Sequence, residues 1–405
     1  MSDAKSAPAR RSFRSRLRRV AQIALLLAGS LTIMLLLAEV ATRLLSDIGP
    51  PIRVRDREIG NRYRRNHETE RFVPEGDRVV ALRFNRDGFR GPDREPLKPE
   101  NTCRVAVIGD SHIAAIATPE EQTLVSRLET LLEDGDTHRR WEVFNYGVSG
   151  GSTAQEMVVY QKIASRYDPD IVVLAFFDGN DLSDNSHELS SSPRIYMELD
   201  SEGRLRQRAL SARINPYSAW LGRNSRFYVW QKHSFRILKA NLRKKSRVLG
   251  PPRRQYAYST EGRKDVERAW RLTEALLTTF RDQVESDGRR FLLVVIPTGD
   301  RMFADIWEAG LGRLEHVERG EASRRLREIV DRGAIDTVFL EEPYERHIAG
   351  RESDDEAAWV HFNSDGHINE RGSEIAAEAI RDRLSVADPQ LSDCSQPFRP
   401  AQEPL

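Results

Sequence analysis

Short apolar runs alternate with helical patterns through most of the chain. The runs that read as buried strands are centred on residues 105–108, 143–148, 171–177, 291–296 and 337–340. Helices are expected between them, over residues 119–133, 153–167, 261–284, 321–330 and 370–384. Strands that alternate with helices predict right-handed βαβ units, and therefore a three-layer α/β/α fold around a central parallel sheet.

The N-terminus has a different pattern. Residues 1–19 contain seven Lys or Arg and a single acid, and the following run from Val20 to Ala38 carries no charge. At about 1.5 Å per residue this run spans roughly 28 Å, close to the hydrocarbon core of a bilayer at about 30 Å. We therefore expect a cytoplasmic basic tail over 1–19 and a transmembrane anchor over 20–45.

A cleaved signal peptide and a buried soluble helix are the alternatives to an anchor. The apolar run is long for a signal peptide, and no small-x-small cleavage site follows it cleanly. The basic residues before the run favour a cytoplasmic N-terminus. This orientation in the inner (cytoplasmic) membrane, with a single pass, would place the rest of the chain on the extracytoplasmic or periplasmic side.

Composition divides the remainder of the chain. Polar residues 46–101 are expected to form a stalk and lead-in, residues 102–386 the main domain, and residues 387–405 a polar tail. The main domain contains a basic insertion at about 185–260. Within it, the segment from Arg204 to Arg254 holds fifteen Lys or Arg and no acid, interleaved with aromatic residues. This segment is a solvated insertion, a lid that attracts an anionic glycan, or a surface that rests on anionic lipid headgroups.

The net charge of the chain excludes few classes of function by itself. Sixty-three basic residues balance 62 acids, so the net charge of +1 gives no argument for nucleic acid, and the predicted membrane orientation argues against it. The sequence has no phosphate-binding glycine loop, Cys-x-x-Cys pair or His-rich cluster, so neither a cofactor nor a metal is expected. Cys103 and Cys394 either form one disulfide in an oxidising compartment or remain free thiols.

Four polar segments follow the apolar runs and offer the groups that acyl transfer through a serine requires. In an open α/β sheet, chemistry collects at the carboxyl ends of the strands, so polar residues directly after strands are candidates. Such chemistry needs a nucleophile, a base with an orienting acid, and donors for an oxyanion. The segments are Gly-Asp-Ser at 109–111, Asn-Tyr-Gly-Val-Ser-Gly at 145–150, Gly-Asn-Asp at 179–181 and Asp-Gly-His at 365–367.

The order of these motifs resembles that of the SGNH hydrolases, also called GDSL-like esterases, lipases and acyl-modifying enzymes, of the membrane-anchored bacterial type. The resemblance covers roughly residues 84–384 and implies the flavodoxin-like fold of that family, preceded here by one N-terminal transmembrane helix. It also implies roles for individual residues. They are Ser111 as nucleophile, His367 as base, Asp365 as the acid that orients the base, and an oxyanion hole formed by the N–H groups of Ser111 and Gly150 and the side chain of Asn180.

Two positions depart from the family pattern. Many members place the acid three residues before the histidine, where this chain has Ser364. The residue after the nucleophile is His112, a variant found in the branch associated with O-acetylation of polysaccharides. The second departure leaves both hydrolysis and acyl transfer open.

The expected function is that of a membrane-anchored serine esterase, which cleaves an acyl ester, possibly O-acetyl, on an extracytoplasmic glycan or lipid. An O-acyltransferase that modifies an envelope polysaccharide is one alternative, because the two reactions share every step up to the acceptor. The other is a non-catalytic glycan-binding or scaffold protein that keeps the same fold.

Overall fold

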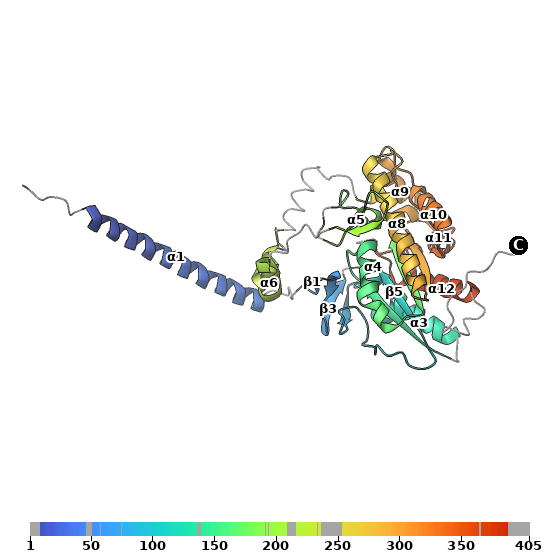
Figure 1. Ribbon diagram of the computed structural model, residues 1–405, viewed down its shortest axis with the longest axis horizontal. Helices are drawn as coiled ribbons and strands as arrows, with labels where there is room; N and C mark the ends of the chain where they lie inside the picture. Colours follow the sequence, from blue (N-terminus) through green and yellow to red (C-terminus); the bar gives the residue numbers. More distant parts are fainter. Residues whose placement is uncertain are drawn as a thin grey trace, which may run out of the picture. The chain divides into compact units, whose positions relative to one another are not determined.

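The computed structural model of the chain contains two compact units, one within residues 1–52 and 214–249 and the other within residues 53–213 and 250–405. Their helices and strands are labelled in Figure 1. The residues that the structure describes are 9–45, 51–56, 58–73, 75–135, 139–190, 192, 194–208, 216–232, 234–235, 253–363 and 366–387.

A sheet of five parallel strands forms the centre of the second unit. Its strands are β5 (Thr102–Gly109), β6 (Arg140–Gly147), β7 (Ile171–Phe177), β10 (Arg290–Ile296) and β11 (Thr337–Phe339). They lie in the order β11-β10-β7-β5-β6, and all neighbouring pairs are parallel. Counted along the chain this is the order 2-1-3-4-5, which is that of flavodoxin-like folds. The predicted central parallel sheet is therefore confirmed.

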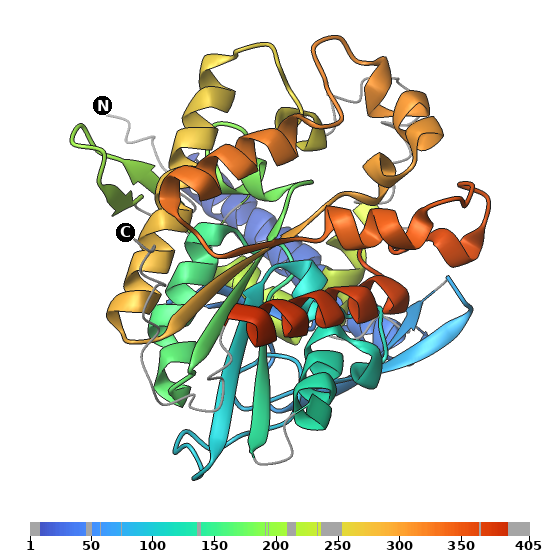
Figure 2. The ribbon, with the colours of Figure 1, turned by 90° about the vertical axis from the view of Figure 1, so that its right-hand side faces the viewer.

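Helices cover both faces of the sheet, which explains why its four longer strands are buried along almost their whole length. Side chains that alternate along each strand enter two separate hydrophobic clusters. One cluster includes residues of α4 (Thr153–Lys162), α8 (Lys264–Ser286) and α10 (Glu321–Gly333). The other includes residues of α3 (Leu124–Gly135), α11 (Glu341–Ile348) and α12 (Glu370–Ala387). Figure 2 shows the strands passing between these two layers, which is the predicted three-layer arrangement.

Three antiparallel hairpins lie outside this sheet. They are formed by β1 (Arg53–Asp56) with β2 (Gly60–Tyr63), β3 (His67–Val73) with β4 (Arg78–Phe84), and β8 (Met197–Leu199) with β9 (Leu205–Gln207). The first two belong to the lead-in, and alternate residues of β4 (Val80, Leu82 and Phe84) are buried. Most of the segment predicted as a stalk is therefore folded within the second unit.

Short helices follow several strands of the second unit. They are α2 (Ser111–Ala114), α5 (Asp181–Asn185) and α9 (Ala304–Ala309). Cys103, buried at the start of β5, is disulfide-bonded. Cys394, the chain's other cysteine, lies outside the described residues, as does the predicted tail from residue 388 onward.

The first unit contains α1 (Ala9–Leu45), α6 (Pro216–Asn224) and a further helical stretch over residues 226–232. Within α1, Arg18–Leu45 is long and apolar enough to cross a membrane, and an 18-residue window in it has a mean hydropathy of 2.3. Length and composition alone support this assignment, and a signal sequence near the N-terminus shares both properties. The helix also begins earlier than the predicted anchor, at Ala9.

Candidate active site

Ser111 is the first residue of α2 and follows the carboxyl end of β5 after a single residue. That residue, Asp110, caps α2, because its Oδ1 accepts the N–H of His112 at 2.9 Å. The turn is tight, and a Cβ atom on Gly109 would lie only 2.6 Å from the side chain of Ile113. The strand-to-helix turn therefore fixes the serine at the edge of the sheet where the motif predicted it.

His367 lies beside Ser111, although the two residues are far apart in the sequence. Its Nε2 lies 2.7 Å from the Oγ of Ser111, across 256 residues of sequence. The loop that carries it is held by backbone hydrogen bonds: the N–H of Phe362 donates to the carbonyl of His367 at 2.7 Å, and that of Gly366 donates to the carbonyl of Phe362 at 2.9 Å. Asp365, the predicted orienting acid, and Ser364, which occupies the position of the acid in many family members, lie outside the described residues.

His112 connects the nucleophile turn to the histidine loop. Its Nδ1 accepts the N–H of Ile368, the neighbour of His367, at 3.3 Å. The ring is 2% exposed and packs 4.0 Å from the ring of Phe177. Burial, followed by the nearby His367 and His361, holds the pKa of His112 well below its ordinary value, so the ring is neutral and its Nδ1 is free to accept. The sequence pointed to His112 only as a family variant and did not indicate this role.

Gly150 lies in the loop after β6 and lines the same cavity as Ser111. Its φ of +74° is one that glycine adopts without strain. Among the described residues, neither the N–H of Gly150 nor that of Ser111 donates a hydrogen bond, so both remain available to an oxygen of a ligand. The adjacent Ser149 is fixed from the lead-in, because its Oγ lies 2.6 Å from the hydroxyl of Tyr63.

Close packing also sets the position of this loop. A Cβ atom on Gly147, which ends β6, would lie 2.2 Å from the backbone nitrogen of Ala114 in α2. Only glycine permits this approach. The side chain of Asn145 adds a second link, since its Nδ2 donates to the carbonyl of Ile113 at 2.8 Å. The motif at 145–150 therefore holds the loop after β6 against the turn that carries Ser111.

Asn180 lies next to these groups but is engaged with carboxylates. Its Nδ2 donates to Oδ2 of Asp110 at 3.4 Å and to Oδ2 of Asp184 at 3.2 Å, and Oδ2 of Asp110 also accepts the hydroxyl of Ser111 at 3.3 Å. Asn180 is not among the residues that line the cavity at the nucleophile. In this structure the amide of Asn180 is therefore linked to Ser111 only indirectly, through the carboxylate of Asp110.

A cavity of about 280 Å³ opens at Ser111, and Gly150 and His367 also line it. Apolar side chains, including Ile116 and Phe362, form part of its wall. Arg71, from the β3–β4 hairpin, contributes a positive charge. Nothing in the sequence marked Arg71, because its place depends on how the lead-in packs against the sheet.

Two buried acids lie on the helices that follow β6 and β7. Glu156 of α4 and Asp181 of α5 are both at most 2% exposed. Burial, followed by the nearby charge of Asp110, raises the pKa of each well above its ordinary value. The nearby Asp184 is paired with Arg194 at 2.6 Å. Burial therefore favours the protonated form of Glu156 and of Asp181.

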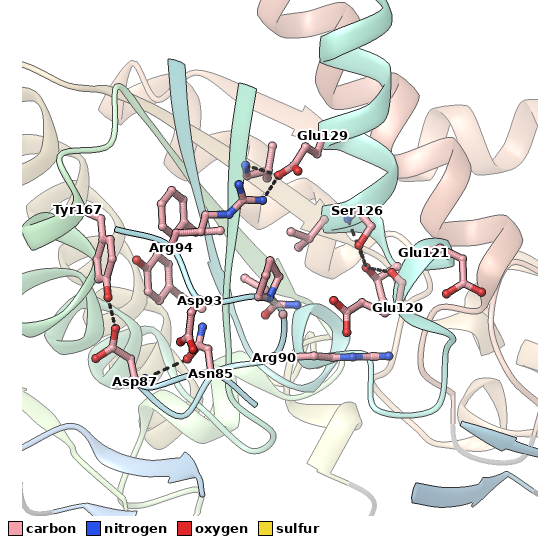
Figure 3. A pocket seen from close by; sticks show the side chains of 18 of the residues that line it. Asn85, Asp87, Arg90, Asp93, Arg94, Glu120, Glu121, Ser126, Glu129 and Tyr167 are labelled. Atoms are coloured by element: carbon pink, nitrogen blue, oxygen red, sulfur yellow. Dashed lines mark hydrogen bonds and ion pairs between the residues drawn. The ribbon is translucent and has the colours of Figure 1, made fainter. Parts of the chain in front are cut away.

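A second cavity, of about 440 Å³, lies between the loop of residues 85–94 and α3 (Figure 3). No residue of the predicted catalytic set lines it. Two of its cations pair with acids of its wall, since Arg86 lies 3.4 Å from Asp93 and Arg94 pairs with Glu129. The third, Arg90, donates to the carbonyls of Ala115 and Thr118. This cavity is not the site of the predicted chemistry. In the part of the chain that the structure describes, no group of three or more His, Cys, Asp or Glu is placed to hold a metal ion.

Known proteins of similar structure include esterases and lipases. An acetyl xylan esterase, AlAXEase, is 12% identical, with 69% of this chain and 99% of that chain covered and a TM-score of 0.38. A lipase/acylhydrolase from Enterococcus faecalis is 11% identical, with 70% and 96% covered and a TM-score of 0.37. A two-domain esterase active on acetylated mannans is 12% identical, with 75% and 54% covered and a TM-score of 0.38. No protein-family model and no curated protein matches the chain.

Proposed function

We propose that the chain is a membrane-anchored serine esterase of the SGNH type, which cleaves a short acyl ester on an extracytoplasmic glycan or lipid. One observation supports this most strongly. The Oγ of Ser111 and the Nε2 of His367 lie 2.7 Å apart, in a cavity that Gly150 also lines. Nucleophile, base and oxyanion donor are thus within reach of a single carbonyl group.

In this proposal His367 activates the serine. Its Nε2 takes the hydroxyl proton as Oγ of Ser111 attacks the ester carbonyl, and the carbonyl oxygen becomes an oxyanion. When the tetrahedral intermediate collapses, the bond to the alcohol breaks and the alcohol leaves with the proton from His367. Water then attacks the acyl-serine in the same way and releases the acid. Asp365 would stabilise the imidazolium that forms in each half of the reaction.

The N–H groups of Ser111 and Gly150 are the proposed donors to the oxyanion, with the amide of Asn180 as the third. Loss of one donor of this kind typically costs about 2.7–4 kcal/mol of barrier. For Asn180 to take part, its amide has to release the carboxylate of Asp110 and donate to the oxyanion instead.

The size of the cavity supports a small acyl group. At about 280 Å³ it is at the lower end of ligand pockets, so an acetyl-sized group fits while the sugar or lipid part of the substrate remains outside. The apolar wall suits the methyl end of such a group. The apolar part of α1 would keep the enzyme at the membrane, with the second unit on the periplasmic side.

The direct test of this activity is hydrolysis of p-nitrophenyl acetate by the full chain in detergent micelles. Ser111→Ala and His367→Ala are each expected to lower kcat by about 10⁴-fold or more, because nucleophile and base act as a unit. Ser286→Ala, at an exposed serine at the end of α8, is the matched control and should retain wild-type turnover. Unchanged turnover in Ser111→Ala would place the nucleophile elsewhere.

A further inference from the structure

The first unit joins the apolar N-terminal helix to the basic insertion through one carboxylate. Glu39 is the only acid in α1. Its side chain accepts the N–H of Arg226 at 3.0 Å, the N–H of Phe227 at 3.1 Å and the hydroxyl of Ser225 at 2.7 Å. These are the free donors at the start of the helix over 226–232, where a negative charge is also favourable. An acid in an apolar helix of this kind is costly unless it has such partners.

Arg43, one turn further along α1, holds the other side of the same junction. Its Nε pairs with Glu39 at 2.7 Å, and its Nη2 donates to the carbonyl of Asn224, the last residue of α6, at 3.0 Å. On this part of α1, Thr42 is buried and Glu39 is half-buried, whereas the large apolar side chains from Val20 to Leu45 are exposed. One turn of α1 therefore clamps α6 and the helix over 226–232 to the end of the apolar helix.

The two clamped helices, called the helix pair below (residues 216–224 and 226–232), expose aromatic side chains. Tyr217 and Trp220 are 78% and 63% exposed, and their spacing of three places them on one face of α6. Trp230 is 41% exposed and stacks on Phe227, with ring centroids 6.1 Å apart. Soluble surfaces rarely gather aromatic residues in this way, whereas Trp and Tyr are enriched where a membrane meets water.

The charge of the helix pair has the sign that anionic headgroups attract. Arg226 and Lys232 lie on its second helix, and no Asp or Glu occurs between Arg204 and Arg254. Lys232 places its Nζ 5.1 Å from the ring centre of Tyr228, which is a cation–π contact on the same helix. Exposed aromatic residues combined with basic residues are typical of helices that lie in the bilayer interface.

We infer that the helix pair is a membrane-interface element that rests on the anionic phospholipid surface through which α1 passes. Trp220 and Trp230 lie at the boundary between headgroups and acyl chains, and Glu39 and Arg43 fix the pair to the end of the spanning helix. The inference rests on the proposed anchoring by α1. The physical reason is that aromatic residues held at the end of an apolar spanning helix lie at the depth where headgroups begin.

Quenching of tryptophan fluorescence by brominated lipid tests this position. The full chain is reconstituted into vesicles of phosphatidylcholine and phosphatidylglycerol, with and without lipid brominated near the headgroup. Of the six tryptophans, Trp141, Trp270 and Trp307 are buried in the second unit and should not be quenched. The wild type is expected to lose emission in brominated vesicles, and the double variant Trp220→Phe/Trp230→Phe is expected to lose most of that quenching. Trp359→Phe, in the second unit, is the matched control and should be quenched like the wild type.

Flotation of the same vesicles distinguishes a failure of the inferred interface position from a failure of the anchor. If the chain floats but bromine leaves its tryptophan emission unchanged, the helix pair does not lie at the membrane interface. The proposed anchoring by α1 would still hold in that case. The same result with self-crosslinking through the helix pair would assign the aromatic face to a second copy instead. A chain that does not float would overturn both the anchor and the inference. Ester turnover, measured in micelles, reports the catalytic site independently of both.

The clamp can be tested by Glu39→Gln, which keeps the size of the side chain and removes its charge. The helix pair should then be held less firmly, so quenching of Trp220 and Trp230 should fall while the chain still floats. Glu70→Gln, at an exposed acid of β3, is the control and should leave quenching unchanged. Full quenching in Glu39→Gln would show that the carboxylate does not hold the pair at the membrane.

Discussion

His112 joins the turn that carries Ser111 to the loop that carries His367. Because its neutral Nδ1 accepts the N–H of Ile368, it holds the loop that carries His367. We expect His112→Leu to lower kcat by about 10- to 100-fold with little change in KM, since small displacements of a base are costly. His112→Asn, whose Oδ1 can accept the same hydrogen bond, should recover much of this loss. Equal kcat values for the two variants would argue against a positioning role.

The orienting acid is a prediction from sequence, because Ser364 and Asp365 lie outside the described residues. Asp365→Asn should lower kcat by about 10²-fold or more, since it removes the negative partner of the imidazolium. Ser364→Ala should have a much smaller effect. The comparison uses kcat for p-nitrophenyl acetate together with thermal unfolding of each variant, and the opposite ranking would reject Asp365 as the acid.

Sequence motifs predicted only part of the candidate site. Ser111, Gly150 and His367 were marked by short motifs, and the structure brings them to one cavity. Asn180 was marked too, although its amide faces Asp110 and Asp184. Arg71 had no local signal, because a residue of an exposed hairpin reaches the cavity only through tertiary packing.

Among the elements, the strands of the central sheet were predicted well because burial on both faces leaves a continuous apolar run. Helix ends were less accurate. The helix expected from Pro119 begins at Leu124, since residues 120–122 form a 3-10 turn, and the helix expected to reach Tyr167 ends at Lys162 before another such turn. The lead-in hairpins were not predicted, because their polar outer faces hide the alternation of buried positions.

The junction of α4 and α5 provides a test of the buried acids. Burial raises the pKa of Glu156 in the folded protein above its ordinary value of 4.5. The folded state therefore keeps a proton that the unfolded chain releases, and the free energy of unfolding falls as pH rises above about 4.5. Glu156→Gln does not titrate, so it should be more stable than the wild type at pH 8 by about 1 kcal/mol, or roughly 2–4 °C in Tm. Near pH 4 this gain should disappear.

Thermal unfolding of both proteins across this pH range measures the difference. Glu133→Gln, at an exposed acid of α3, is the control and should follow the wild type at every pH. A gain in Tm for Glu156→Gln that is the same at pH 4 and pH 8 would show that Glu156 does not hold a proton in the folded state.

At the scale of the whole molecule, the basic insertion divides into parts with different environments. Arg204 and Arg206 pair with Asp200 within the β8–β9 hairpin, which agrees with the solvated alternative for that stretch. The helix pair instead belongs to the unit that contains α1. Sequence alone could not separate these parts, because a count of charges does not show which cations have partners.

The central claim is that Ser111 is an activated nucleophile, and labelling by a fluorophosphonate probe tests it most directly. Mass spectrometry of the full chain in micelles should show one probe on the peptide that contains Ser111. The label should be absent in Ser111→Ala and formed much more slowly in His367→Ala, because an unactivated serine reacts poorly. Undiminished labelling of Ser111→Ala, or no labelling of the folded wild type, would contradict the account.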